Sequence, residues 1–242
     1  YRPASANLGL VDPSTGNVLS VPFVDADTLW SYEIGAKGSV LDGALGYDVA
    51  VYRLNWKDMQ VFRSFMGVNV GGNADSDVTA HGVEATVTLQ PSSSFDFVGS
   101  IAYSQSELNE DDRSIGGVEG EQLPGIPQWT LSLSSTYRFP IGSLEAFVGG
   151  GIVYQDERKT SFIGGIGSNG VPIAPPNPNY TVPDYTTVDL RAGVTMGRYS
   201  FSVYATNAFD EYAFQRATTN TVQGTATILR PRTIGAVFSA EF

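Results

Sequence analysis

Cysteine is absent from this chain of 242 residues, and histidine occurs only once, at His81. The absence of cysteine excludes disulfides, zinc-thiolate sites and thiol catalysis, and a single histidine leaves little basis for imidazole chemistry. No nucleophile motif accompanies His81, so we expect no enzyme, bound metal or cofactor. The net charge of −11 opposes a phosphate backbone, and we therefore expect no nucleic acid partner.

Long apolar runs are also missing, because no stretch of about 18 consecutive apolar residues occurs and no membrane-spanning helix is expected. The mean hydropathy is close to zero, at −0.06. Transmembrane β-strands remain compatible with this value, because alternation hides their apolar residues from a window average. No linker divides the chain, which predicts a single structural unit.

Apolar and polar residues alternate with a period of two, which is typical of β-strands. From Trp129 to Phe139, for example, every second residue is mainly apolar, and the residues between them are polar. Similar segments predict nine strands: Trp30 to Gly38, Leu45 to Trp56, Val83 to Leu89, Phe95 to Ser106, Trp129 to Phe139, Leu144 to Gln155, Val188 to Met196, Tyr199 to Asn207 and Thr233 to Phe242. Most exceed the average of about 5 or 6 residues for soluble strands and reach the roughly 9 to 11 that cross a bilayer.

The connections between these strands alternate in length. Four are tight turns, at Ser39 to Gly43, Pro91 to Ser94, Pro140 to Ser143 and Gly197-Arg198. Four are long and are predicted to be loops, at Lys57 to Asp77, Glu107 to Pro127, Glu157 to Asp184 and Asp210 to Pro231. In an up-and-down meander all the short turns then lie at one end, as in outer-membrane barrels.

The two faces of the predicted strands differ in chemistry. Aromatic residues gather near strand ends on the apolar face, where membrane headgroups favour them. The polar face carries charges of both signs: Glu33, Lys37, Asp48, Glu84, Asp96, Arg138, Glu145, Asp189, Arg191 and Glu241. These charges predict an aqueous or protein-filled lumen with ion pairs on its wall, although the solvated face of a soluble β-sandwich would alternate in the same way.

Six segments together resemble the C-terminal part of a TonB-dependent outer-membrane receptor. They are Tyr32-Glu33-Ile34-Gly35, Trp56-Lys57-Asp58-Met59-Gln60, Asn73-Ala74 with Gly82-Val83-Glu84, Leu123-Pro124-Gly125-Ile126-Pro127, Asn207-Ala208-Phe209-Asp210-Glu211-Tyr212, and Pro231-Arg232-Thr233 before a terminal Phe242. The resemblance implies an all-β, antiparallel up-and-down transmembrane barrel, of which residues 1–242 supply about nine C-terminal strands out of about 22.

The same resemblance implies the cellular setting. We expect a bacterial outer-membrane protein with several membrane-spanning strands, in contact with outer-membrane lipid. The plug domain and early barrel strands, which none of these residues match, are expected in the same or another chain, and the TonB complex is expected to act through that plug. The implied function is active uptake of a scarce nutrient, such as a siderophore, cobalamin or oligosaccharide. A passive pore or structural barrel without energy coupling is the alternative, and a soluble adhesion or lectin-like domain is a third.

Three groups of residues are candidates for binding. The last predicted strand ends in a row typical of the signal read by the barrel-assembly machinery: Ile234, Ala236, Phe238, Ala240 and Phe242. Ligand contacts are expected from aromatic, Arg and amide side chains of the long connections and upper lumen: Phe62, Arg63, Gln105, Tyr180, Phe214 and Arg216. The acidic stretch from Glu107 to Glu121 is either a solvated loop or a calcium site, and the sequence leaves both open.

Overall fold

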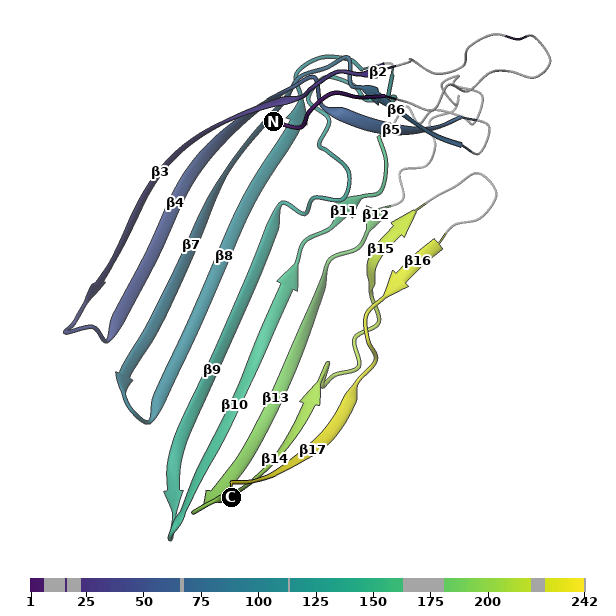
Figure 1. Cartoon of the computed structure of the whole chain (residues 1–242). Helices are drawn as coiled ribbons and strands as arrows, with labels where there is room; N and C mark the ends of the chain where they lie inside the picture. Colours follow the sequence, from purple (N-terminus) through teal and green to yellow (C-terminus); the bar gives the residue numbers. More distant parts are fainter. Residues whose placement is uncertain are drawn as a thin grey trace.

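The computed structural model describes residues 1–6, 16, 23–65, 68–112, 114–162, 181–218 and 225–241. These residues contain no helix, and hence none long and apolar enough to cross a bilayer. They form one curved antiparallel sheet, with small strand pairs at one end (Figure 1). The large sheet contains β3 (Thr28–Val40), β4 (Leu45–Lys57), β7 (Val78–Ser92), β8 (Phe95–Leu108), β9 (Trp129–Ile141), β10 (Leu144–Gln155), β13 (Tyr185–Met196), β14 (Tyr199–Thr206) and β17 (Thr233–Ala240).

The sheet is the meander that the sequence predicts. Its strand order is β17-β14-β13-β10-β9-β8-β7-β4-β3, so each strand pairs with its nearest large neighbours along the chain. The strands are 8 to 15 residues long. All the short turns lie at the lower end in Figure 1, and the described parts of the long connections lie at the upper end. The predicted all-β antiparallel fold is therefore confirmed.

Tight turns form where residues accept a positive φ. In the turn between β3 and β4, Leu41 and Asp42 both have φ of 55° and Gly43 has φ of 89°. The amide of Gly43 donates to the carbonyl of Val40 at 3.2 Å, which closes the turn. Only glycine adopts such angles without steric cost, and aspartate is among the residues that tolerate them best.

Two predictions about the elements were wrong in detail. The strand expected at Val83 to Leu89 runs from Val78 to Ser92 as β7. Three of the four long connections are not simple loops, because within the described residues they contain paired strands. These are β5 (Gln60–Phe65) with β6 (Val68–Asn73), β11 (Arg158–Lys159) with β12 (Thr181–Val182), and β15 (Phe214–Thr218) with β16 (Thr225–Ile228); before β3, β1 (Ser5–Ala6) pairs with β2 (Phe23–Val24).

The register places apolar side chains on one face of the large sheet, which we call the outer face. Leu133 of β9 pairs with Ile152 of β10, which pairs in turn with Val188 of β13. No second layer covers this face within the described residues, and its large side chains are exposed, with Leu190 at 49% and Phe201 at 48%. The soluble β-sandwich interpretation is therefore wrong, because its apolar side chains would pack between two sheets.

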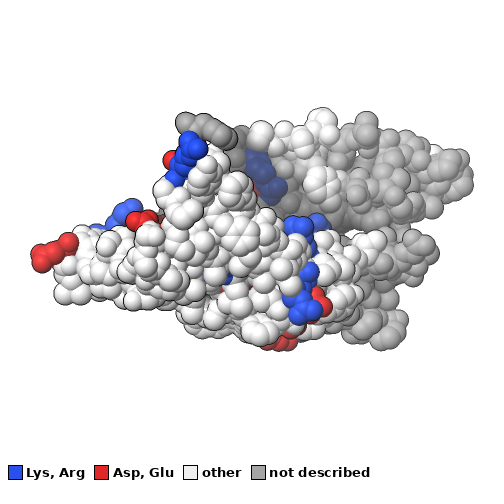
Figure 2. All heavy atoms as spheres, turned by 90° about the horizontal axis from the view of Figure 1, so that it is seen from below, with Lys and Arg blue, Asp and Glu red and all other residues white. Residues whose placement is uncertain are grey.

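The opposite face, which we call the inner face, holds the charged residues predicted to line a lumen. Asp96 pairs with Thr136, and Gly149 pairs with Arg191. Viewed from the short-turn end, the surface shows few charged side chains, separated by wide uncharged areas (Figure 2). In the described part of the chain, β3 and β17 each have one large neighbour only, so the sheet remains open.

Candidate functional site

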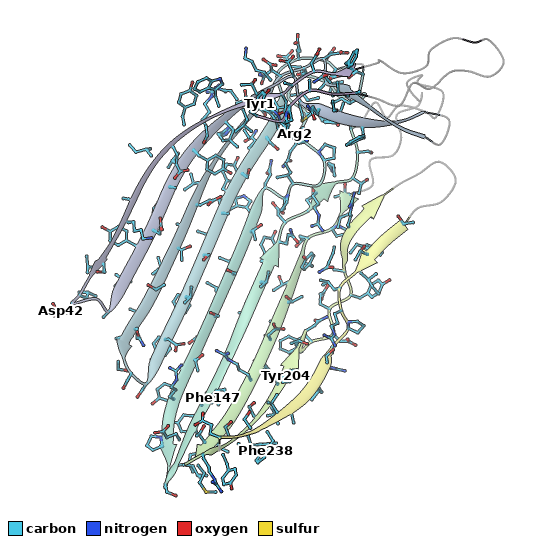
Figure 3. All side chains as sticks on the ribbon, in the orientation of Figure 1. Tyr1, Arg2, Asp42, Phe147, Tyr204 and Phe238 are labelled. Carbon is cyan, nitrogen blue, oxygen red and sulfur yellow. The ribbon has the colours of Figure 1, made fainter. Side chains whose placement is uncertain are left out.

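Aromatic rings lie against glycines along the inner face. Phe147 of β10 faces Gly193 of β13, and a Cβ added at Gly193 would come within 2.5 Å of the ring. Tyr204 of β14 lies over Gly235 of β17 in the same way, and Tyr52 of β4 lies over Gly82 of β7. Figure 3 labels Phe147 and Tyr204 on their strands. Glycine leaves room for a ring to lie along the sheet, so these pairs form a closely packed wall.

Charged residues on the inner face form the predicted ion pairs. Arg138 contacts Asp96 at 2.7 Å, and Lys37 contacts Asp48 at 3.7 Å. Arg191 extends across Gly149 and donates to the hydroxyl of Thr136 at 2.6 Å. The two ion pairs join neighbouring strands, and Arg191 of β13 reaches across β10 to β9, which confirms that the mixed charges share one face.

A cavity of about 460 Å³ opens near the short-turn end of the sheet. Its lining includes Arg138, Glu145, Phe147 and Thr195, all on the inner face. Two charges of opposite sign and an aromatic ring are suited to receive a polar segment of another polypeptide.

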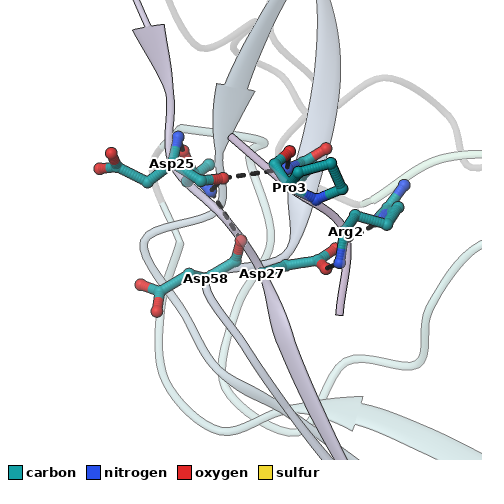
Figure 4. A network of polar contacts seen from close by, with 7 residues as sticks. Arg2, Pro3, Asp25, Asp27 and Asp58 are labelled. Carbon is teal, nitrogen blue, oxygen red and sulfur yellow. Dashed lines mark hydrogen bonds and ion pairs between the residues drawn. The ribbon is translucent and has the colours of Figure 1, made fainter. Parts of the chain in front are cut away.

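The opposite end of the sheet is closed by a polar network around Arg2 and Asp27 (Figure 4). The backbone amide and the Nε of Arg2 each donate to Asp27 at 2.7 Å, and Asp27 is almost completely buried. Burial raises the pKa of Asp27, but hydrogen bonds from Arg2 and Trp56 and the charge of Arg2 outweigh it, so the pKa lies below its ordinary value of 3.8. Asn73 continues the network by donating to the carbonyls of Asp25 at 3.0 Å and Asp58 at 2.7 Å.

Beside this network lies a small apolar core between the long connections. It consists of Met59, Ala74, Val78 and Leu108, with Trp56 packed against it. No sequence pattern predicts this folded rim, because it joins Met59 and Ala74 of one connection to the ends of β7 and β8 without a regular spacing.

The acidic stretch between β8 and β9 uses carboxylates to hold its own backbone. Asp112 is fully buried and accepts from the amides of Ser76 at 3.0 Å and Ser114 at 2.8 Å. Asp111 accepts from the amide of Glu119, and Glu121 accepts from the amide of Val118. No group of three acidic or histidine residues suited to a metal ion occurs among the described residues. The carboxylates fit a structural role in this loop.

The motif from Asn207 to Tyr212, which carries much of the family resemblance, joins the end of β14 to the start of β17. Asn207 is buried, has φ of 48°, and donates to the carbonyls of Glu211 at 2.9 Å and Arg230 at 3.1 Å. Asp210 accepts from the amide of Arg232 at 2.8 Å. Hydrogen bonds therefore hold the Asn207–Tyr212 motif against the Pro231-Arg232-Thr233 motif, at the point where β14 ends and β17 begins.

The candidate ligand residues are divided among separate elements. Phe62 projects from β5 and is 81% exposed, and Arg63 follows it in the same strand. Phe214 and Arg216 both lie on β15, whose backbone carbonyls at Phe214 and Gln215 accept hydrogen bonds from the buried Arg158. Gln105 stands apart on the outer face, where it accepts from Tyr103 and donates to Glu107. Tyr180 lies outside the described residues.

The terminal row occupies the outer face of β17. Ile234 and Phe238 are exposed, and they pair with Ala205 and Phe201 of β14. Phe238 lies near the short-turn end (Figure 3). Ala236 and Ala240 complete the described part of the row, and Phe242 lies outside the described residues.

A family model and a curated relative agree in the comparison with known sequences. The family model for the β-barrel of TonB-dependent receptor-like proteins matches residues 1–208. The metal-pseudopaline receptor CntO of Pseudomonas aeruginosa is 26% identical over 211 residues, which cover 86% of this chain and 27% of that receptor. The chain therefore spans about a quarter of the curated relative.

Solved structures share the fold. The ferric yersiniabactin uptake receptor FyuA from Yersinia pestis matches 99% of this chain and 33% of its own, with a TM-score of 0.74 and 18% identity. The pyoverdine receptor FpvA from Pseudomonas aeruginosa matches 98% of this chain and 33% of its own, at 0.70 and 20%. The siderophore receptor PiuA from Acinetobacter baumannii matches 94% of this chain and 30% of its own, at 0.69 and 21%.

Proposed function

Because the chain belongs to the TonB-dependent receptor-like β-barrel family, we propose that residues 1–242 form the C-terminal part of a bacterial outer-membrane transport barrel. The plug domain and the earlier strands lie in the rest of the same protein or in another chain. The assembled receptor takes up a scarce nutrient, and the TonB complex supplies energy through the plug. The relatives are named as receptors for metal or iron chelates, which favours a siderophore or related metal complex as the nutrient.

The observation that carries this proposal is the contrast between the two faces of a single-layered sheet. The outer face exposes large apolar side chains over long strands, whereas the inner face carries ion pairs and polar groups. Hydrocarbon favours the first composition, and a lumen favours the second. A barrel closed by further strands would also remove the two open edges, at β3 and β17, which are a liability in any isolated sheet.

Two carboxylates on the inner face support the presence of a plug. Glu33 of β3 and Glu84 of β7 face the lumen on either side of β4, and neither forms an ion pair within the described residues. Carboxylates in a protein-filled lumen require cationic or hydrogen-bonding partners. We expect cationic side chains of the plug to supply them, which favours a plugged receptor over the passive pore.

Ligand contacts at the outer end of the barrel are expected from the strand pairs in the long connections. Phe62, Phe214 and Arg216 lie on two such pairs, and aromatic and Arg side chains dominate binding surfaces. Arg63 shares the strand of Phe62, and Tyr180 belongs to the connection after β10. Gln105 is the weakest of these candidates, because its outward position turns it away from the lumen.

The terminal strand β17 is proposed to be the segment that the barrel-assembly machinery recognises. One edge of β17 pairs with β14, and its other edge has no partner within the described residues. Backbone pairing to that edge gives affinity, and the row of Ile234, Ala236, Phe238, Ala240 and Phe242 gives specificity.

Uptake by intact cells tests the proposed function. Cells that carry or lack the gene for the full receptor are supplied with radioactive iron bound to a panel of siderophores, with TonB present or deleted. Active transport predicts that one chelate accumulates only when both the receptor and TonB are present. Accumulation that is independent of TonB would support the passive pore instead.

A further inference from the structure

The outer face changes from apolar to polar at one level on three neighbouring strands. Passing upward from the short turns, the register joins Val51 of β4 to Val83 of β7 and Tyr103 of β8 as the last apolar row. Two residues higher, it joins Arg53 to His81 and Gln105. The row above that contains Asn55, Thr79 and Glu107, and no described position higher on this face of the three strands returns to an apolar residue.

This change marks the upper boundary of the hydrocarbon layer. An arginine at the bilayer midplane of a barrel is destabilising, whereas the same residue near the interface costs little. Arg53 and His81 are both exposed, so the row that contains them belongs at the level of the lipid headgroups. Tyr32 of β3 pairs with Arg53 and is 59% exposed, which suits an aromatic ring at the same interface.

Arg53 is the cation on this part of the face that lacks a carboxylate partner among the described residues. Its Nε donates to the amide oxygen of Asn55 at 3.3 Å, and its other guanidinium N–H donors have no partner in the described part of the chain. The nearby acidic groups have other contacts: Asp77 lies 3.7 Å from Lys57, and Glu107 accepts from Gln105 at 3.0 Å.

We propose that Arg53, with His81 and Tyr32 beside it, binds the phosphate headgroup of an outer-leaflet lipid. The acyl chains of that lipid lie on the apolar rows that begin at Val51 and Val83, directly below. An arginine fork matches the oxygens of a phosphate, and the adjoining imidazole and phenol supply further hydrogen-bond donors. The site rests on the proposed function in one respect, because it requires the outer face to lie in a membrane.

Lipid retention by the full-length receptor tests this site. The receptor is reconstituted into phosphatidylcholine vesicles containing lipid A, either with its phosphates or with the phosphates removed, and lipid that remains bound after detergent extraction is counted by native mass spectrometry. The test variant combines Arg53→Gln with His81→Gln. The control is Lys37→Gln, which removes an exposed cation from the inner face of the same barrel.

We expect the double variant to retain phosphorylated lipid A about tenfold less than the wild type, which corresponds to the loss of one charge-assisted hydrogen bond. The control and the phosphate-free lipid should show no such difference. Equal retention by wild type and double variant, or equal loss in the control, would overturn the site. Failure of the wild type to insert into either vesicle would instead contradict the proposed function.

A second pair of variants guards against misfolding of the double variant. Arg53→Lys keeps the charge but loses the fork, so retention should fall between wild type and Arg53→Gln. Identical retention by Arg53→Lys and Arg53→Gln, at the wild-type level, would also overturn the site.

Discussion

The packing of Phe147 on Gly193 gives a prediction that the geometry makes quantitative. In Gly193→Ala the new Cβ would lie 2.5 and 2.8 Å from two atoms of the Phe147 ring, and 2.9 Å from the carbonyl oxygen of Phe201. The first two contacts require the ring to move. Overpacking of this kind typically costs about 1–3 kcal/mol, and we expect a loss of unfolding free energy within that range.

A double-mutant cycle separates the ring from other causes. In a Phe147→Ala background the ring is gone, so Gly193→Ala should cost less than it does in the wild type, and the contact of 2.9 Å with the backbone carbonyl of Phe201 accounts for the cost that remains. Gly151→Ala is the matched control on the same inner face, since its Cβ would meet only the carbonyl oxygen of Leu133 at 3.4 Å. It should be neutral or slightly stabilising.

The assay is urea-induced unfolding of the full receptor in phospholipid vesicles, followed by tryptophan fluorescence. Strictly additive effects of Gly193→Ala and Phe147→Ala would refute the proposed contact. A loss in Gly151→Ala equal to that in Gly193→Ala would show that any added methyl group destabilises this wall.

Three further predictions concern the outer face, the C-terminal motif and the rim. Leu190→Arg should lower the unfolding free energy in vesicles by about 2–4 kcal/mol, whereas Thr187→Arg on the inner face of the same strand should cost much less; equal losses would contradict the assignment of faces. Asn207→Ala should lower the unfolding free energy by about 2–4 kcal/mol in the same assay, because hydrogen bonds are lost and alanine disfavours a positive φ. Asn207→Gly should be about 1 kcal/mol more stable than Asn207→Ala, because glycine accepts a positive φ. Equal stability of the two variants would contradict the contribution of the positive φ. The folded pKa of Asp27 lies below its unfolded value of 3.8, so hydrogen-exchange protection around Asp27 should be complete above that value and fall as the pH drops through the folded pKa. Asp27→Asn should remove this pH dependence. An unchanged pH profile in Asp27→Asn would contradict the contact with Arg2.

The alternation of residues was sufficient to predict the sheet, because each strand places mainly apolar side chains on one face and polar side chains on the other. Trp129 to Phe139 follows that rule at every position except Ser135, and β9 forms there with an extension to Ile141. The rule fails at the upper end of β7. Thr79 and His81 are polar residues on the outer face there, so they interrupt the alternation, and the pattern alone predicts a strand shorter than β7.

The folded rim was beyond sequence reasoning for a different reason. Arg2 binds Asp27 within the segment before β3, and Asn73 of the next connection binds the carbonyl of Asp25, and neither contact follows a sequence period. The outward position of Gln105, in contrast, follows from the alternation, since it lies two residues from Tyr103 on the same strand. The alternation therefore places Gln105 outside the lumen.

The most direct measurement of the central claim is the collision rate of spin labels with oxygen and with a water-soluble nickel complex. Because the chain contains no cysteine, single cysteines are introduced at Leu131, Ser132, Leu133 and Ser134 of β9 in the full receptor. Our account predicts that labels at positions 131 and 133 collide mainly with oxygen dissolved in the lipid, whereas labels at positions 132 and 134 do not. Accessibility that fails to alternate along β9, or that alternates in the opposite sense, would contradict it.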